Sequence, residues 1–397
     1  MSPGSSGIVD AIDAYAEGLQ FKAIKVFDRG MRNDAVWQIL RDNVRASALV
    51  VGDMEAQVAA SRIGAERMAE LVKQWGLPVF RAACAALMDH AERLMRQAIA
   101  RLPDGTWRAE TFIDGYLDDP DPARRELPVV ATVTKRGDGL VVDLTGTAPQ
   151  VKDRPINMPL TGTVDVAVWL TVRSVLLDTA VHGHIPVNEG LTRPIEIIAP
   201  KGCLANPEFP APTIARFCPG NQLADTVMKA LAQAVPDQVI ASGFDTTTSG
   251  CLSWMGDEGF SVYLEIYGGG YGASATANGC DAIDMPMANC ANTPVEAIDQ
   301  DYSFFRVEEY ALVPEAYGHG AHRGGAGFVK AFRILKDNAT VALYSDRFRN
   351  APQPLFGGMP GTTGACEIHR GNEVISLGSK DMRELKKGDL VVFRLGG

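Results

Sequence analysis

The sequence has no apolar run long enough to cross a membrane and no cluster of basic residues. A spanning helix needs about 18 or more consecutive apolar residues. The N-terminus also lacks a charged segment followed by an apolar one, which is the pattern of an export signal. A net charge of −10 disfavours non-specific binding to nucleic acid. We therefore predict a cytoplasmic protein that binds neither membranes nor nucleic acid.

Several motifs of catalysis and cofactor binding are also missing. The seven cysteines include no Cys-x-x-Cys pair, and a chain of 397 residues can fold without disulfides, so free thiols are expected. No Gly-Lys-Ser/Thr follows a glycine-rich loop, and no Gly-x-Ser-x-Gly marks a nucleophile. The residues alone therefore indicate neither a phosphate-binding loop nor a catalytic group.

The N-terminal part has the pattern of helices. Apolar residues between Asn33 and Arg101 recur every three to four positions, which is the period of an amphipathic helix. Gly76 and Pro78 interrupt the pattern, which predicts a helical hairpin. Residues 1–32 lack such a pattern, and we expect them to form an N-terminal arm that docks on a partner.

From Thr106 onward the pattern changes to that of strands. The segments Thr106–Ile113, Leu127–Lys135 and Gly139–Leu144 predict a β-meander. Later elements are expected as helices at Val164–Leu177 and Asn221–Val235, strands at Ile195–Ile198 and Leu390–Phe393, and a hairpin of Phe328–Leu335 with Ala339–Ser345. We therefore predict an α+β (mixed α/β) fold, with an N-terminal helical hairpin followed by mixed, largely antiparallel sheets with packed helices. Its expected divisions are the arm (1–32), a helical region (33–105) and an α+β domain (106–397).

A glycine-rich stretch follows one predicted strand. Ser261–Tyr267 has the β-branched and aromatic alternation of a strand, and Gly268, Gly269, Gly270 and Gly272 come directly after it. Residues without a Cβ let the backbone approach another backbone or a ligand closely. The stretch is therefore either a loop that faces a substrate or a bulge that closes a sheet edge.

Two further candidates combine amide and charged side chains. Asn188 and Glu189 lie in a loop between a proline and a glycine, with Arg193 nearby. Such a loop suits the orientation of a polar ligand, although the same residues can form a capped turn. Asn221 directly precedes a predicted helix, where it can serve as the N-cap or where the helix N-terminus can offer donors to a ligand.

The histidines form two close pairs, His182 with His184 and His319 with His322. Alternate positions on a strand, or adjacent turns of a helix, can place either pair on one face for a metal ion. No carboxylate stands out beside either pair and glycines flank both, so polar contacts at a surface or lid are the alternative.

Several stretches, in the same order along the chain, resemble one known family. They are LPDGTW at Leu102–Trp107, LTGTAPQV at Leu144–Val151, IPVNEGLTRPIEIIAPKGCLANP at Ile185–Pro207, GGGYGA at Gly268–Ala273, NTPVE at Asn292–Glu296 and RGGAG at Arg323–Gly327. On these stretches the chain resembles the hydantoinase B/5-oxoprolinase family, which is related to the acetone and acetophenone carboxylase subunits.

The chain also departs from the pattern of that family. Complete members begin with a region whose Asn-Asp-Pro-Tyr and Gly-Gly-Thr-His-x-x-Asp motifs bind a divalent metal. These motifs are missing here, and residues 1–21 resemble the family just downstream of them. Where members often carry a histidine, the sequence reads Met287-Ala288-Asn289, so the resemblance transfers no acid or base. We therefore expect this chain to bind no cofactor itself, with ATP and a divalent metal (Zn or Mn) held by partner subunits.

The resemblance implies a subunit of a heteromeric, ATP-dependent, metal-assisted enzyme that is inactive alone. The expected partners are a hydantoinase A-like actin-fold ATPase, a subunit carrying the missing metal-binding region, and a small ketone or cyclic amide. A ketone carboxylase of the acetone or acetophenone type is the first expectation. Opening of a cyclic amide by a hydantoinase, oxoprolinase or lactamase is the second, and a noncatalytic structural subunit is the third. The residues expected to contact substrate are Asn188, Glu189, Arg193, Asn221, Gly268, Gly269, Gly270, Asn289 and Asn292.

Overall fold

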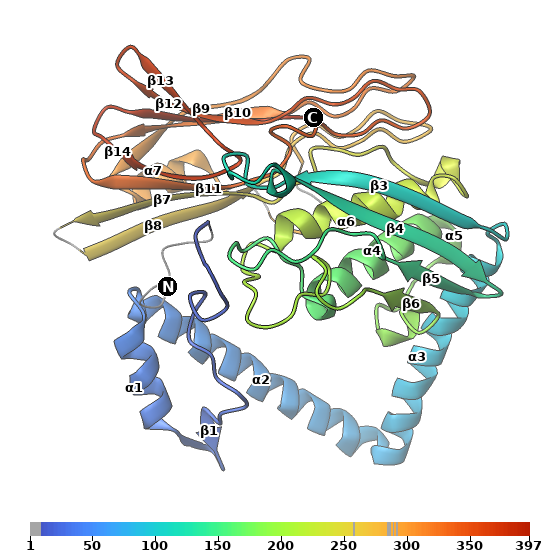
Figure 1. The fold of residues 1–397 in the computed structure, drawn as a ribbon. Coiled ribbons are helices and arrows are strands. Elements are labelled where there is room, and N and C mark those ends of the chain that lie inside the picture. The colour runs from blue at the N-terminus through green and yellow to red at the C-terminus, as the bar shows by residue number, and fades with distance from the viewer. Residues whose placement is uncertain (1–8, 257–258, 284–286, 289, 291–292) are drawn as a thin grey trace.

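The computed structural model describes residues 9–397, apart from 257–258, 284–286, 289 and 291–292. A body built on a β-meander (residues 106–239, the meander body) lies beside a body of two packed sheets (residues 248–395, the sandwich body) (Figure 1). A helical region projects from one side of the molecule. The mixed α/β class, the largely antiparallel sheets and the N-terminal helices predicted from the sequence are confirmed.

The helical region follows a short hairpin. Its elements are β1 (Phe27–Asp28), β2 (Met31–Arg32), α1 (Asp34–Asn43), α2 (Ser47–Trp75) and α3 (Leu77–Ala100). Gly76 takes a φ of 79° and ends α2, and Pro78 lies in the first turn of α3, where its missing N–H is not needed. The predicted helix break is therefore present. The two helices diverge from this corner (Figure 1).

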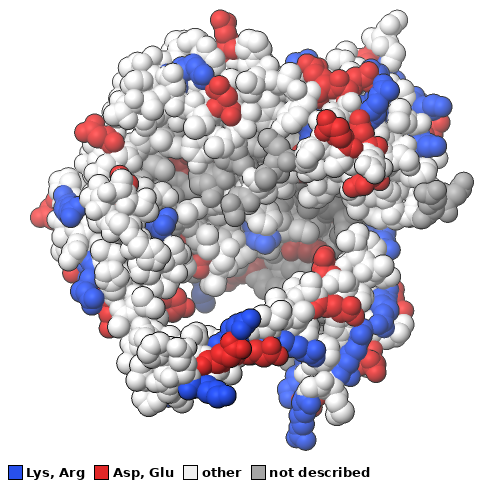
Figure 2. All heavy atoms as spheres, turned by 180° about the vertical axis from the view of Figure 1, so that it is seen from behind, with Lys and Arg blue, Asp and Glu red and all other residues white. Residues whose placement is uncertain are grey.

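Helix α2 contacts α1 and the short N-terminal hairpin but stands away from the two bodies (Figure 1). No residue of this fully described helix is buried, and an open space separates it from the body above it (Figure 2). The final turns of α3, in contrast, bury Ala91, Met95, Ala98 and Ile99 against the meander body. The end of α3 is thus anchored on the meander body, whereas α2 contacts the N-terminal segment, where Arg32 pairs with Glu55 and Arg62 lies over the ring of Phe27. None of the described helices has the length and apolar content that a membrane span requires.

The described part of the N-terminal arm packs on the chain itself. The carboxylate of Glu17 accepts hydrogen bonds from the backbone N–H groups of Thr213 and Ile214. The ring of Tyr15 meets the edge of Phe209, with 5.4 Å between centroids. Docking of residues 1–32 on a partner stays a prediction.

The meander body is a sheet covered on one face by helices (Figure 1). Its strands are β3 (Thr106–Asp114), β4 (Glu126–Arg136), β5 (Gly139–Asp143) and β6 (Ile195–Ile198), in that order, with β6 parallel to β5. The helices are α4 (Asp165–Leu176), α5 (Thr179–His182) and α6 (Phe217–Leu231), with helical turns η1 (Pro122–Arg124), η2 (Leu160–Val164), η3 (Glu189–Leu191) and η4 (Pro236–Gln238). Buried side chains such as Val129, Val168 and Leu223 fill the space between the layers.

The sandwich body consists of two sheets with an aromatic core. One sheet has the order β14-β11-β7-β8 and the other β13-β12-β15-β10-β9. The elements are β7 (Thr248–Gly256), β8 (Gly259–Tyr267), α7 (Val295–Asp301), β9 (Phe305–Leu312), β10 (Phe328–Ile334), β11 (Ala339–Tyr344), β12 (Ala365–Arg370), β13 (Glu373–Leu377), β14 (Lys380–Leu385) and β15 (Leu390–Leu395). Tyr263 and Phe332 lie with their ring centroids 5.8 Å apart and belong to the core between the sheets.

The predicted hairpin of Phe328–Leu335 with Ala339–Ser345 is wrong. Both strands exist, but β10 pairs with β9 and β15, whereas β11 pairs with β7 and β14 in the other sheet. Both strands are buried along nearly their whole length, and each is flanked by strands on both sides. The short connection therefore crosses between the two sheets, with Asn338 at a φ of 61°.

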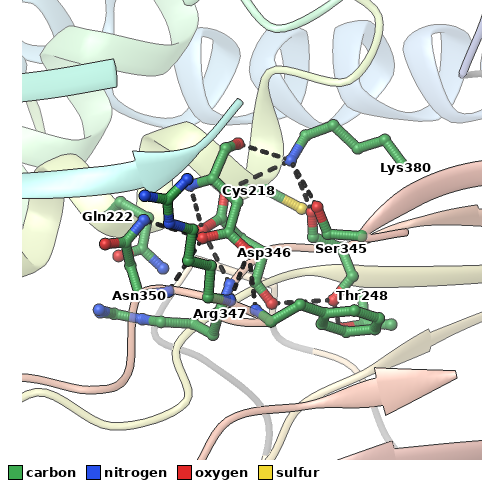
Figure 3. A network of polar contacts seen from close by, with 12 residues as sticks. Cys218, Gln222, Thr248, Ser345, Asp346, Arg347, Asn350 and Lys380 are labelled. Carbon is green, nitrogen blue, oxygen red and sulfur yellow. Dashed lines mark hydrogen bonds and ion pairs between the residues drawn. The ribbon is translucent and has the colours of Figure 1, made fainter. Parts of the chain in front are cut away.

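A buried polar network joins the two bodies (Figure 3). The carboxylate of Asp114, at the end of β3, accepts hydrogen bonds from the backbone N–H groups of Phe348, Arg349 and Asn350 at 2.8–3.0 Å, and from the Asn350 side chain at 2.9 Å. Lys380 Nζ, on β14, donates to the carbonyl oxygen of Asp114 at 2.7 Å. These bonds connect the edge of the meander sheet to the sandwich.

Two further carboxylates of this network lie beside basic groups. Asp346 Oδ2 is 3.6 Å from Lys380 Nζ, and Arg347 Nη2 donates to Asp225 Oδ2 at 2.7 Å. Burial raises the pKa of Asp346 to about 6, in spite of the nearby lysine. Asp225 shares a hydrogen bond with Asp245, and burial raises the pKa of both carboxyl groups. The junction therefore contains acids that retain protons at a higher pH than exposed aspartates do.

Candidate functional site

A groove in the meander body gathers three of the residues predicted to contact substrate. Asn188, Glu189 and Arg193 line one wall, and the outer face of α4 lines the other, around a volume of about 500 Å³. Val166, Trp169, Leu170 and Arg173 form the helical wall. A pocket of this size, with apolar walls and a few polar groups, has the character of a small-molecule site.

The wall opposite α4 is fixed by its contacts with α3. Asn188 Oδ1 accepts from Gly190 N–H at 2.8 Å and so caps the helical turn η3. A Cβ at Gly190 would lie 1.9 Å from the carbonyl oxygen of Met88, so only glycine allows this approach. Asn188 also donates to the carbonyl oxygen of Leu87 at 3.3 Å. Of the two alternatives left by the sequence, the capped turn is present, and contact of this segment with a ligand stays a prediction.

Arg193 serves mainly to hold this wall in place. Its Nη1 lies 3.1 Å from Asp89 and 3.0 Å from Glu92, both on α3. The hydrogen bond from Arg193 lowers the pKa of Glu92, and a second one from Arg96 lowers it further. The two carboxylates balance the charge of Arg193 and use both donors of its Nη1, so contact of this residue with a substrate stays a prediction.

Two polar groups of residues that line the groove have no hydrogen-bond partner among the described residues. Glu189 is exposed, and its carboxylate makes no hydrogen bond or ion pair with another described residue. The indole Nε1 of Trp169 is buried and has no hydrogen-bond partner among the described residues. The groove thus combines an unpaired acceptor, an unpaired donor and apolar walls.

Sequence reasoning missed the helical wall. The segment Val164–Leu177 reads as a strongly apolar core helix, and most of it is buried as expected. Trp169 and Arg173 are spaced i, i+4 and therefore lie on one face of the helix. On this face the amphipathic Trp169 and the charged Arg173 interrupt the otherwise apolar pattern. That interruption is the signal from which the face could have been found.

Asn221 lies outside the groove, and its predicted role as an N-cap is wrong. Helix α6 begins at Phe217, so Asn221 is inside the helix, and only 1% of it is exposed. Its side-chain amide donates to Thr247 Oγ1 at 2.7 Å and to the carbonyl oxygen of Phe217 at 3.1 Å. Asn221 therefore belongs to the polar junction between the two bodies.

The glycine-rich stretch also lies outside the groove, where backbones pack against each other. A Cβ at Gly270 would lie 1.8 Å from the carbonyl oxygen of Gly325, and one at Gly269 would lie 2.5 Å from that of Gly396. Gly270 N–H donates to Gly396 at 2.9 Å, and Gly269 exchanges hydrogen bonds with Ile283. Gly268 is buried beside them. Gly269 and Gly270 are therefore required for close backbone packing in the sandwich body.

The remaining predicted positions are not gathered at one place. Asn289 and Asn292 lie outside the described residues. His182 lies on α5, whereas His319 and His322 line a pocket of about 210 Å³ that residues of both bodies enclose. In the described ranges, no three His, Cys, Asp or Glu side chains cluster as metal ligands would.

Comparison with known proteins identifies the family of the chain. The model of the family described as Hydantoinase B/oxoprolinase matches residues 1–397. The chain belongs to this family.

Two curated members of the family are similar to most of the chain. The B subunit of a putative D-/L-hydantoinase from Pseudomonas sp. (strain NS671) is 51% identical over 381 residues, covering 96% of this chain and 64% of the relative. The beta chain of the caprolactamase of Pseudomonas jessenii is 29% identical over 353 residues, covering 85% of this chain and 57% of the relative. The chain thus spans less than two thirds of the length of these relatives.

Solved structures share the fold over the whole chain. The ATP-dependent caprolactamase from Pseudomonas jessenii superimposes with a TM-score of 0.83 at 24% identity, covering 100% of this chain and 69% of that one. Nucleotide-free acetone carboxylase gives a TM-score of 0.86 at 14% identity, covering 100% of this chain and 59% of that one. A caprolactamase and an acetone carboxylase, which catalyse different reactions, therefore share the fold of this chain.

Proposed function

We propose that the chain is the B-type subunit of an ATP-dependent complex that opens a cyclic amide. The observation that carries this proposal is the 51% identity with the B-type component of a putative hydantoinase over nearly the whole chain. The similarity to a caprolactamase component points to the same class of bond. The complex would work in the cytoplasm, and this chain would be inactive without its partners.

The partners would supply the groups that activate the amide. They are a hydantoinase A-like ATPase with an actin fold and a subunit carrying the divalent metal, Zn or Mn. The described residues of this chain offer no cluster of metal ligands, and its sequence has no phosphate-binding motif. We therefore assign no step at the metal or at ATP to residues of this chain.

The groove would hold the ring of the substrate. A cyclic amide presents a donor N–H, an acceptor carbonyl oxygen and an apolar ring. Glu189 would accept from the N–H, since its carboxylate is exposed and has no other described partner. The ring of Trp169 would pack beside the substrate as part of the helical wall. Val166, Leu170 and Leu191 would contact the ring carbons.

Substitution of Glu189 in the assembled complex tests this role. Glu189→Gln should lower kcat/KM for ATP-coupled ring opening by about tenfold, because the charged acceptor is replaced by a weaker, neutral amide oxygen. Glu196→Gln is the matched control, since Glu196 is also exposed, on the neighbouring strand β6, but does not line the groove. Equal rates for both variants and the wild type, with assembly intact, would favour a noncatalytic structural subunit instead.

Carboxylation of a ketone is the second candidate, and the shared fold with acetone carboxylase favours it. It requires the same partners as ring opening. Supplying the complex with ATP, bicarbonate and a small ketone in place of a cyclic amide separates the two reactions. Product formation only with the ketone would establish carboxylation.

A further inference from the structure

A second pocket lies next to the groove in the meander body. It has a volume of about 640 Å³ and lies between the ends of α3 and α4, the short helix α5 and the turn η4. Figure 1 shows α5 close to the end of α3. Arg173 lines both this pocket and the groove, so the two spaces meet at one side chain.

Two arginines of this pocket have no neutralising partner. Within the described residues, the guanidinium groups of Arg101 and Arg173 form no ion pair and donate no hydrogen bond, and the Nε of Arg173 is buried. Nearby arginines behave differently, since Arg96 pairs with Glu92 and Arg193 pairs with Asp89. Each unpaired guanidinium lies at the C-terminal end of a helix, where the dipole favours a cation without neutralising it.

Two acids also line the pocket, but neither forms an ion pair with Arg101 or Arg173. The Asp178 carboxylate accepts from Ala180 N–H at 2.8 Å as the N-cap of α5. Asp237 is exposed on η4 and forms no ion pair with a described residue. His182 Nδ1 lies 2.9 Å from the carbonyl oxygen of Asp178 and therefore donates to it, and His182 Nε2 is buried without a partner among the described residues.

We propose that this pocket binds the carboxylate or phosphate group of a small molecule, with Arg173 as the central contact and Arg101 as the second. A planar guanidinium binds either oxyanion with two parallel hydrogen bonds. Two such groups, neither of them paired with a described residue, leave their N–H donors available to an anion that enters the pocket.

The position of Arg173 also suggests what the ligand is. Hydrolysis of a cyclic amide breaks the C–N bond, adds water across it and leaves a carboxylate and an amino or ureido group. A ring held in the groove would thus release its new carboxylate beside Arg173. This second step rests on the proposed function, whereas binding of an anion by the pocket does not.

Calorimetric titration of the chain with succinate, and separately with inorganic phosphate, tests the pocket at low salt. We expect one of these anions to bind at one site per chain. Arg173→Gln should weaken binding by about tenfold or more, because a charge-assisted hydrogen-bond pair is lost. Arg173→Lys should weaken it less, since it keeps the charge, and Arg101→Gln should also weaken it.

Arg81→Gln is the matched control. Arg81 is exposed on the same helix as Arg101 but twenty residues earlier, which places it about 30 Å away along the helix. It should bind like the wild type. Binding of succinate would identify a carboxylate ligand, and binding of phosphate a phosphorylated one. Absence of binding by both anions would overturn the proposal. Unchanged binding by Arg173→Gln, with unaltered circular dichroism, would overturn it as well. Failure of ring opening by the complex would count against the proposed function without changing this titration.

Discussion

Asp114 joins the meander body to the sandwich body through the hydrogen bonds of its carboxylate. Its carboxylate accepts from consecutive backbone N–H groups at 348–350 and from the Asn350 side chain, and the residue is fully buried. Nothing in the local sequence marks it, because its partners lie more than 230 positions away along the chain. Side chains of this kind can be found only once the two bodies are placed together.

Replacing Asp114 should weaken the whole fold. Asp114→Asn removes the charge and places an N–H₂ donor against backbone donors, so we expect a loss of about 2–4 kcal/mol in the free energy of unfolding. Urea denaturation measures it, with Asp118→Asn as an exposed control on the following loop. A loss below about 0.5 kcal/mol, the usual range for surface positions, would contradict the role of Asp114 at the junction.

Asp346 should make stability depend on pH in a definite direction. Its pKa is raised to about 6 by burial, whereas an aspartate of the unfolded chain titrates near 3.9. The folded state therefore holds an extra proton between these values, and stability should fall as the pH rises from about 4 to 7, by about 3 kcal/mol. The contribution of Asp346 to the free energy of unfolding is fully present below the pKa of the aspartate in the unfolded chain. It is lost as the pH rises through the pKa of Asp346 in the folded chain.

Asp346→Asn tests this titration. The variant cannot release the proton, so the fall in unfolding free energy between pH 4 and 7 should become shallower than in the wild type. Asp138→Asn, at an exposed turn, should keep the wild-type slope. Identical slopes for wild type and Asp346→Asn would show that Asp346 is ionised throughout this range.

At the scale of elements, periodicity predicts the meander and the apolar helix but not the neighbours of each strand. The predicted strands after Thr106 agree closely with β3, β4 and β5. The pairing of β10 and β11 was missed because alternation shows that a strand is buried and not which sheet it joins. The start of α6 was missed because Pro219 reads as a breaker, although proline is tolerated in a first helical turn.

Glycine substitutions distinguish packed elements from exposed ones. Gly272→Ala would place a Cβ 1.6 Å from the carbonyl oxygen of Ala241, so the backbone must move, and we expect a loss of more than about 4 kcal/mol or failure to fold. Gly64→Ala, in the exposed helix α2 with no atom within 4 Å, should instead stabilise the chain by up to about 1 kcal/mol. Thermal unfolding compares the two variants directly.

The opposite ranking would contradict the packing described for the glycine-rich stretch. A fold that tolerates alanine at position 272 would leave room there for the substrate-facing loop that the sequence left open. Gly64 controls for the loss of glycine flexibility itself, because its surroundings are open.

At the scale of the whole molecule, the groove belongs to one body and the glycine-rich packing to the other. The motifs that carry the family resemblance therefore divide between two tasks. Asn188, Glu189 and Arg193 shape the groove, whereas Gly269 and Gly270 allow backbones to pack too closely for a Cβ. The sequence could nominate both groups because both use unusual residues, but it could not tell binding from packing, since glycine serves either purpose.

In the proposed function, this chain completes the substrate site of an ATP-dependent complex. The direct measurement is ATP-coupled opening of a hydantoin ring by the actin-fold ATPase and the metal-bearing subunit, purified with and without this chain. We expect turnover only when all components are present, with none by the chain alone. Equal turnover without the chain, or turnover by the isolated chain, would contradict it.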